Sequence, residues 1–409
     1  MTESSSKKIP IYGITILTLC NMFNYLDRNI FNSLAPVIKV DLDLSHVQIG
    51  LLASAFNVIY VIACPMMGLL GDKYQRPRIL SVSVFFWSIS TTFAGFARGF
   101  WSMAVARSSV GIGEAAYSSI GPALIDDYTP KAWKSRVMGV FLLAVPVGSA
   151  LGYLLGGVLH ETVGWRHAFW VIGTPGLILA VLTYFIREPN KNLGQDKADF
   201  FPELKSNVWD LLHNSTYIFA VAGYTAFTFV VGAMSVWMPE IMVSAKNISL
   251  LNGNLLFGGI TVVTGIIGTF IGSYLSDRLL KKTDRAPIII CTVSILLSVP
   301  FAIAVLLVEN NTLFFVMLFI CEIFLFINTA PITIVLLNSV PVGQRSIAMG
   351  LSVLVMHALG DAISPPLIGF LADRSNILAA SILLPIGLVV GFIFWAICFR
   401  VQKNQIQAV

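Results

Sequence analysis

Residues 68–78 read Gly-Leu-Leu-Gly-Asp-Lys-Tyr-Gln-Arg-Pro-Arg, and the first part of this stretch returns three times along the chain. Each copy has a small residue, a leucine two positions later and a carboxylate two positions after that. The other copies are Gly157-Val-Leu-His-Glu161, Ser273-Tyr-Leu-Ser-Asp277 and Gly369-Phe-Leu-Ala-Asp373. Four copies with the same spacing indicate an internal structural repeat.

The composition is that of a protein embedded in a membrane. Hydrophobic residues make up 56% of the 409 residues and charged residues 11%, and the mean hydropathy is +0.81. A soluble domain cannot carry so little polar surface. Apolar runs of about 20 residues predict twelve transmembrane helices near 11–35, 46–70, 79–97, 101–125, 137–160, 167–186, 214–239, 251–276, 287–308, 312–340, 346–372 and 378–399.

The net charge of +5 follows from the distribution of basic residues around these helices rather than from a nucleic-acid surface. With a cytoplasmic N-terminus, cytoplasmic segments hold 19 of the 26 Lys and Arg, the opposite side holds five, and two lie inside helices. The positive-inside rule therefore predicts cytoplasmic N- and C-termini. We expect a protein of the plasma (cell inner) membrane, in contact with membrane lipids and not with nucleic acid.

Sequence features of enzymes and cofactor sites are not found. The five cysteines fall inside the predicted helices without metal-ligand spacing. No Gly-x-x-x-x-Gly-Lys-Ser/Thr loop, His-Glu-x-x-His or Gly-x-Ser-x-Gly motif occurs. The polar first ten residues lack the architecture of a cleaved signal peptide. We predict no catalytic residue, metal or cofactor, and the intramembrane enzyme is a disfavoured alternative.

The repeat defines the domain organisation. Residues 187–212 include the longest polar stretch and are predicted to link an N-terminal bundle, 1–186, to a C-terminal bundle, 213–409. Each copy of the pattern ends the second helix of a three-helix unit, and three spans invert every following unit. The predicted fold is therefore all-α, with two six-helix bundles that each contain two inverted three-helix repeats. Each carboxylate can accept hydrogen bonds at a neighbouring helix N-terminus.

Residues 68–78, together with twelve helices in two halves, resemble the signature of the major facilitator superfamily. That signature runs Gly-x-Leu-x-Asp-basic-x-Gly-Arg-basic, and this chain departs from it at Gln75 and Ser273. The resemblance implies a rocking-bundle transporter. The residues that we assign to this conformational motif are Gly68, Asp72, Lys73, Arg76, Arg78, Asp277 and Arg278.

The first and fourth helices carry charged residues in otherwise apolar sequence, which is costly unless the side chains face protein or a wet cavity. Asn24 and Arg28 lie on one helix face, whereas Asp27 lies about 100° away and should face a sister helix of the same half. Arg107 and Glu114 are two turns apart and can line one cavity. We predict that Glu114 carries the proton, with a purely structural ion pair as the alternative.

The second half contributes fewer charges. Glu322 has no obvious sequence partner and is assigned to the cavity, whereas His357 and Asp361 are one turn apart. Pro365 and Pro366 free backbone carbonyls and give the eleventh helix a place to bend. In the fifth helix a seam of small residues predicts close helix packing, with a partial resemblance to an antiporter motif; the seam comprises Pro146, Gly148, Gly152, Gly156 and Gly157.

Three segments resemble the Spinster branch of the superfamily: 24–28, 107–126 and 357–369. The resemblance implies export of lysophospholipids or sphingoid-base phosphates. It marks Asp27, Arg28, Arg107, Glu114 and His357 as substrate and proton residues. With the residue-level argument, the proton-coupling set is Glu114, Asp27, His357 and Asp361, and the substrate set is Arg28, Arg107, Asn24, Tyr117 and Glu322.

The expected function is secondary active transport by alternating access, coupled to protons, of an amphipathic anionic lipid. The binding site is expected between the halves near the midplane, in a monomer. Two arginines suit an anionic headgroup, and aromatic side chains such as Tyr117 suit an acyl tail. The alternative is a proton symporter of small organic anions such as sugar acids, which the first-helix motif also resembles. A channel is disfavoured, because inverted repeats suit alternating access.

Overall fold

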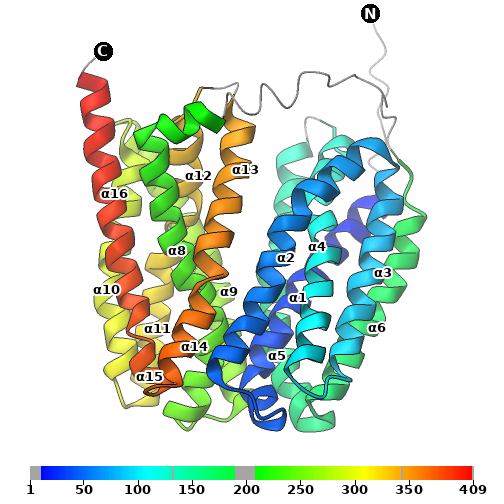
Figure 1. The fold of residues 1–409 in the computed structure, drawn as a ribbon. Coiled ribbons are helices and arrows are strands. Elements are labelled where there is room, and N and C mark those ends of the chain that lie inside the picture. Colours follow the sequence, from blue (N-terminus) through cyan, green and yellow to red (C-terminus); the bar gives the residue numbers. More distant parts are fainter. Residues whose placement is uncertain (1–10, 131–132, 189–207, 342–343, 408–409) are drawn as a thin grey trace, which may run out of the picture. The chain divides into compact units, whose positions relative to one another are not determined.

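The computed structural model describes residues 11–130, 133–188, 208–341 and 344–407, and within these ranges it contains helices and no strand. Apolar stretches form helices because a helix satisfies every backbone polar group within its own segment. Figure 1 shows the helices coloured along the sequence from the N-terminus to the C-terminus. The first six are α1 Ile11–Asp41, α2 His46–Lys73, α3 Arg76–Ala94, α4 Phe100–Tyr128, α5 Lys134–Val163 and α6 Trp165–Tyr184.

The later part of the chain has more interruptions in its helices. Two short π-helices, η2 and η4, lie in these interruptions. The elements are α8 Ser215–Glu240, η2 Ile241–Ala245, α9 Leu250–Leu280, α10 Ala286–Leu307, α11 Asn311–Phe326, α12 Thr329–Asn338, α13 Arg345–Met356, η4 His357–Asp361, α14 Ser364–Ala372, α15 Ile377–Ala380 and α16 Leu383–Gln407.

Polar caps set several helix starts. The side chains of Asn214, Ser249 and Asn310 accept hydrogen bonds from backbone N–H groups in the first turns of α8, α9 and α11. These caps satisfy donors that a helix leaves unpaired at its start. Gly164 joins α5 to α6 with φ +83°, a backbone conformation that glycine adopts without strain.

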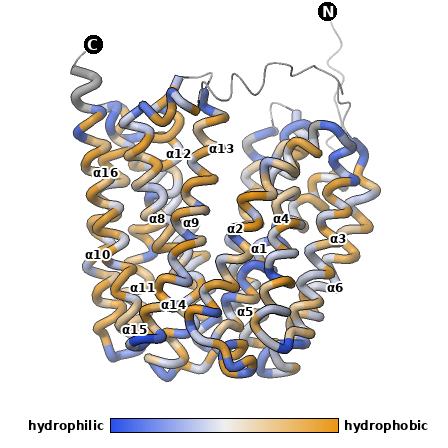
Figure 2. Tube along the Cα trace, in the orientation of Figure 1, coloured by the Kyte–Doolittle hydropathy of each residue, from blue (hydrophilic) through white to orange (hydrophobic). Residues whose placement is uncertain are grey.

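The chain is an integral membrane protein. Within the described residues, nine helices are long and apolar enough to span a membrane, and twelve spans stay a prediction. Hydrophobic residues run along the helices and hydrophilic ones gather toward many of the helix ends (Figure 2). Large apolar side chains such as Trp101 and Phe270, 79% and 77% exposed, face outward. Such a surface suits lipid rather than water.

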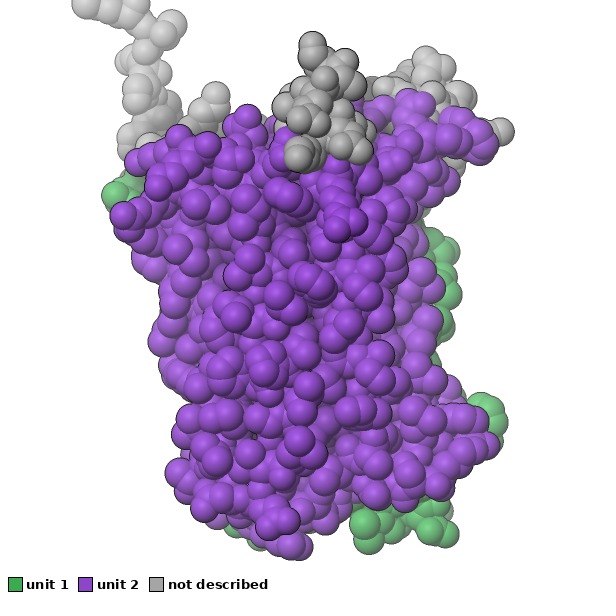
Figure 3. Space-filling model, turned by 90° about the vertical axis from the view of Figure 1, so that its left-hand side faces the viewer, with its two compact units in different colours: residues 1–44, 55–195 green, residues 45–54, 196–409 purple. Residues whose placement is uncertain are grey.

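The chain divides into two compact units, coloured separately in Figure 3. Unit 1 comprises Met1–Leu44 and Ala55–Gln195, and unit 2 comprises Ser45–Ser54 and Asp196–Val409. The main division falls inside the predicted linker 187–212. The sequence did not predict that the first turns of α2 group with the C-terminal unit.

In unit 1, the glycine seam of α5 packs directly against α1. A Cβ added at Gly152 would lie 2.6 Å from the Leu26 carbonyl oxygen and 2.8 Å from Asn29 Cβ. Cβ atoms added at Gly148 and Gly156 would also collide with α1. The predicted close packing at these three glycines is therefore present, and it fixes the position of the α1 segment that carries Asp27 and Arg28.

In unit 2, the helix that contains Pro365 and Pro366 is broken, as the prolines predict. It passes from α13 through η4 to α14, and both prolines lie in the first turn of α14. Pro366 cannot donate to the carbonyl of Ala362, four residues earlier. That carbonyl accepts a hydrogen bond from Ser54 Oγ at 2.5 Å, and the Pro365 carbonyl accepts one from Trp237 Nε1 at 3.1 Å.

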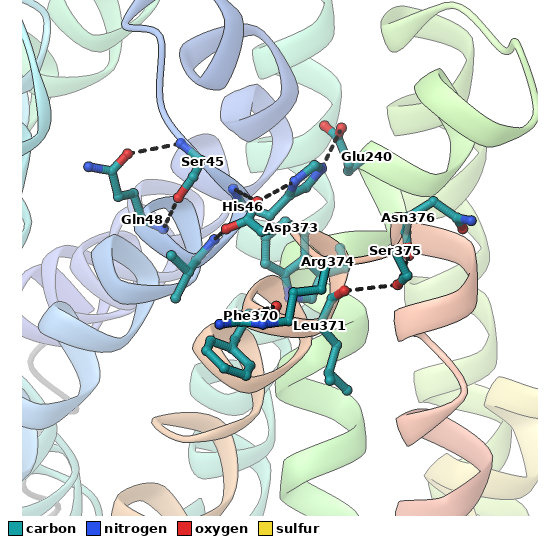
Figure 4. Close-up of polar contacts among 12 residues, drawn as sticks. Ser45, His46, Gln48, Glu240, Phe370, Leu371, Asp373, Arg374, Ser375 and Asn376 are labelled. Carbon is teal, nitrogen blue, oxygen red and sulfur yellow. Dashed lines mark hydrogen bonds and ion pairs between the residues drawn. The ribbon is translucent and has the colours of Figure 1, made fainter.

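The carboxylate of the fourth motif copy caps the start of α2 within the same unit (Figure 4). Asp373 accepts from the backbone N–H of His46 at 2.8 Å and of Val47 at 2.9 Å. Burial alone would raise the pKa of Asp373, but these N–H groups and the His46 ring hold it below the usual 3.8. The expectation that a motif carboxylate accepts at a neighbouring helix N-terminus is confirmed for this copy.

His46 also lies near a second carboxylate. Its Nδ1 is 2.9 Å from Asp373 Oδ1, and its Nε2 is 3.6 Å from Glu240 Oε1 at the end of α8. The imidazole therefore lies between two carboxylates at the ends of α8 and α14 (Figure 4). This cluster brings together segments that are far apart in sequence.

Candidate functional site

Helix α1 directs Asp27 and Arg28 toward different partners, as their angular separation predicts. Asp27 is 3% exposed and accepts a hydrogen bond from the hydroxyl of Thr91 on α3. Its other oxygen, Oδ1, is buried and has no hydrogen-bond partner among the described residues. Asp27 thus faces a sister helix of unit 1, and one side of its carboxylate has unused hydrogen-bonding capacity.

Arg28 forms a buried ion pair with Glu114 on α4. Arg28 Nε lies 2.6 Å from Glu114 Oε2, and the two side chains are 16% and 0% exposed. Three rings surround the guanidinium: its Cζ lies 5.0, 4.9 and 4.6 Å from the ring centroids of Tyr25, Phe56 and Tyr60. Cation–π attraction and the ion pair together offset the cost of burying the charge.

Arg107 lies on the same helix as Glu114 but is held differently. It is 3% exposed, and its Cζ lies 4.5 Å from the Phe31 ring centroid and 5.1 Å from that of Phe56. Its Nε has no hydrogen-bond partner in the described part of the chain. A buried guanidinium with an unpaired donor is suited to receiving an anion.

The arginine cage of unit 1 comprises Arg28, Arg107, Glu114 and the rings of Phe31, Phe56 and Tyr60. Sequence spacing predicted the charged members. It missed the rings and Thr91, because aromatic and hydroxyl side chains are common in such helices and only tertiary packing selects these. Asn24, the predicted neighbour of Arg28, is 2% exposed and lies in the buried interior of the same unit.

Tyr117 does not belong to the arginine cage. Its hydroxyl donates to the carbonyl of Leu17. Its ring packs edge-on against Trp87 and stacks on Phe141 with the planes inclined by 28°, and the centroids are 5.8 and 6.5 Å away. The side chain is 2% exposed in the apolar core of unit 1. This position favours a packing role for Tyr117 over the predicted contact with an acyl tail.

His357 and Asp361 pair in unit 2, inside η4. His357 Nδ1 lies 2.8 Å from Asp361 Oδ2, with the side chains 18% and 15% exposed. A Cβ added at Gly360 would lie 2.9 Å from the Thr225 carbonyl oxygen, so η4 passes close to α8. The predicted proximity of the two residues is present in the structure, and their role in proton coupling stays a prediction.

Glu322 has partners that its own helix sequence did not reveal. Thr261 Oγ1 and Thr264 Oγ1, both on α9, lie 3.2 and 2.9 Å from its two carboxylate oxygens. The side chain is 3% exposed. Its contacts are with α9 of unit 2, and these contacts give no support for a substrate role.

The predicted conformational-motif residues differ in their contacts. Arg76 bonds to Asp127 and Glu188, each at 2.7 Å. Lys73, Arg78, Asp277 and Arg278 are exposed, and the guanidinium of Arg78 lies 6.0 Å from the ring centroid of a tyrosine on α6. A Cβ added at Gly68 would meet no described atom within 4 Å, so close packing does not explain a glycine there. The side chain of Asp72 lies outside the described residues.

The fold and the intramembrane charges define a transporter of the major facilitator class. The sequence profile of the Major Facilitator Superfamily matches residues 17–365. A solved bacterial homologue of the human lysosomal transporter Spinster, in an inward-facing and unoccupied conformation, superposes with a TM-score of 0.86 at 21% identity. The match covers 97% of this chain and 98% of that one, and at this identity it shows the shared fold.

Curated relatives narrow the assignment. Human protein spinster homolog 1 is 33% identical over 385 residues, covering 88% of this chain and 72% of its own. The zebrafish sphingosine-1-phosphate transporter SPNS2 is 32% identical, covering 90% and 77%. The fruit-fly protein spinster is 32% identical, and the chain spans 62% of its length. The chain therefore belongs to the Spinster family of transporters and is not an enzyme.

Proposed function

We propose that this protein is a proton-coupled, alternating-access carrier of an amphipathic anionic lipid of the lysophospholipid or sphingoid-phosphate type. The supporting observation is the arginine cage, in which Glu114 neutralises Arg28 while Arg107 has an unpaired buried donor. A phosphate offers several acceptor oxygens and matches the fork of a guanidinium. The rings beside both arginines can contact the apolar part of the same cargo.

Proton binding at Glu114 and anion binding at Arg28 are linked in this scheme. While Glu114 is ionised, it competes with the cargo for Arg28. Protonation of Glu114 releases the guanidinium, so a proton and an anion bind the cage together more favourably than either binds alone. The linkage predicts transport of both in the same direction through each cycle.

The name of the zebrafish relative supports a lipid phosphate as the cargo. The cage by itself also suits a small carboxylate, so a sugar-acid symporter is the competing assignment. The basic residues of the predicted loops support cytoplasmic N- and C-termini, and the plasma membrane is the location that we propose.

The proposal is tested with purified protein in liposomes under an imposed pH gradient. Flux of a lysophospholipid, a sphingoid phosphate and a hexuronate is compared in the same preparation. We expect lipid flux that rises with the gradient and little hexuronate flux. Hexuronate flux without lipid flux would replace the lipid assignment by the sugar-acid one, and no gradient dependence for any cargo would refute proton coupling.

A further inference from the structure

Glu322 is a buried carboxyl group beside which the described residues place no cation. The span Asn311–Asn338 places it about 16 Å of helix rise from one end and about 24 Å from the other, near the middle of the apolar segment. Its only hydrogen-bond partners in the described part of the chain are the hydroxyls of Thr261 and Thr264. No Lys, Arg or His of the described residues pairs with it.

The described residues of the helices packed around Glu322 place no charged side chain near it. The described sequence of α10 contains Cys291 as its single titratable residue, and α11 adds only Cys321 beside Glu322. On α9, Tyr274, Asp277 and Arg278 follow Thr264 by ten residues or more, a rise of about 15 Å or more. No described cation lies near enough to neutralise an ionised carboxylate here, which favours the uncharged acid.

The hydroxyl of Thr264 can serve both protonation states of Glu322. Thr264 Oγ1 lies 2.9 Å from Glu322 Oε2 and 2.7 Å from the carbonyl oxygen of Ile260. A hydroxyl has a single proton to donate. When Glu322 is ionised, that proton points to Oε2. When Oε2 carries a proton, the carboxyl donates to Thr264 Oγ1, and the hydroxyl turns to Ile260.

Neither state leaves the carboxyl oxygens without a partner, and the change between them needs only rotation of one hydroxyl. We therefore infer that Glu322, with Thr264 as its exchange partner and Thr261 as a fixed donor, is a second proton-binding site, held in unit 2. One proton adds to one carboxylate oxygen, and no other bond changes. This site is separate from the arginine cage and requires no particular cargo.

Infrared difference spectroscopy on full-length protein in lipid nanodiscs tests this inference without measuring transport. The carbonyl stretch of a protonated carboxyl group is read at neutral pH. We expect a band that is lost in Glu322→Gln and retained in Glu114→Gln. Thr264→Val should shift the band because the carboxyl loses its acceptor, whereas Thr264→Ser should restore the wild-type position. Size-exclusion profiles confirm that each variant is folded.

Three results would overturn the inference. The neutral-pH band could persist in Glu322→Gln, or Thr264→Val could leave it unshifted. A band that appears on removal of Na⁺ instead of following pH would identify a sodium site. If Glu322→Gln does not fold, the shift in Thr264→Val and its recovery in Thr264→Ser decide the question. Loss of gradient-driven transport would refute the proposed function and leave these spectra unaffected.

Discussion

Replacement of Gly152 by alanine should perturb the helix segment that carries Asp27 and Arg28. The added Cβ would lie 2.6 Å from the Leu26 carbonyl oxygen, where ordinary contacts are 3.4–4 Å, so α1 and α5 must separate by about 1 Å. Overpacking of this kind costs about 1–3 kcal/mol. Alanine returns about 1 kcal/mol through its higher helix propensity, so a clash in the middle of that range leaves a net loss of about 1 kcal/mol.

The matched control is Gly139→Ala on the same helix. Gly139 is exposed, and a Cβ there would meet no atom within 4 Å of the described structure. This variant keeps the propensity gain without the clash. Thermal unfolding of purified protein should therefore show a Tm that is lower by about 2–4 °C for Gly152→Ala, at about 2–4 °C per kcal/mol, and unchanged or higher for Gly139→Ala.

The transport rates of Gly152→Ala and Gly139→Ala should also differ. A shift of α1 by about 1 Å would disturb the 2.6 Å bond from Arg28 to Glu114, and errors of this size in positioning cost on the order of tenfold or more in rate. Gly139→Ala should transport like the wild type. Equal stability and equal flux for the two variants would show that close packing of α5 does not position the charged segment of α1.

Three other substitutions have defined outcomes. Thr91→Val should cost about 1–3 kcal/mol, because it removes the described hydrogen-bond donor of buried Asp27; Thr91→Ser should recover the loss in thermal unfolding, and a stable valine variant would contradict the assignment. Asp373→Ala should lower stability by about 1 kcal/mol at neutral pH, because alanine has no side-chain acceptor for the backbone N–H groups of His46 and Val47. Because the folded-state pKa of Asp373 is lowered, this contribution is present above pH 3.8 and is lost as the pH falls through the folded-state pKa, so the mutant and wild-type Tm values should converge in acid. Arg107→Lys should keep the fold and weaken binding of an anionic cargo by about tenfold, since the charge remains but the guanidinium fork is lost; unchanged affinity in a binding titration would remove Arg107 from the site.

The sequence predicted features that depend on spacing along one helix. The separation of Asp27 and Arg28 by about 100° around the helix predicted that they have different partners. The two prolines at the start of α14 predicted an interruption of that helix. The motif carboxylates were predicted to accept hydrogen bonds at helix N-termini, and Asp373 does so at the start of α2. Local geometry was sufficient in each of these cases, because the relevant atoms belong to one helix or to its end.

Features that depend on which helices touch were not predicted. Glu322 had no visible partner, because its two donors lie about 60 positions earlier on α9. Tyr117 was assigned to the cargo, although its ring packs against Trp87 in the core. Residues 45–54 belong to unit 2. The composition of the sequence does not change at the ends of this segment, so the boundary could not be predicted. Threonine and aromatic side chains occur throughout these helices, so sequence alone cannot select those that contact a charge.

The most direct test of the central claim is gradient-driven lipid flux in Glu114→Gln, compared with wild type and with the exposed-carboxylate control Glu309→Gln, which lies outside the repeated motif. Glutamine has nearly the same shape as glutamate but cannot exchange a proton. The account predicts that lysolipid flux follows the pH gradient in wild type and in Glu309→Gln and ignores it in Glu114→Gln. Wild-type flux that ignores the gradient, with Glu114→Gln behaving identically, would contradict proton coupling through Glu114.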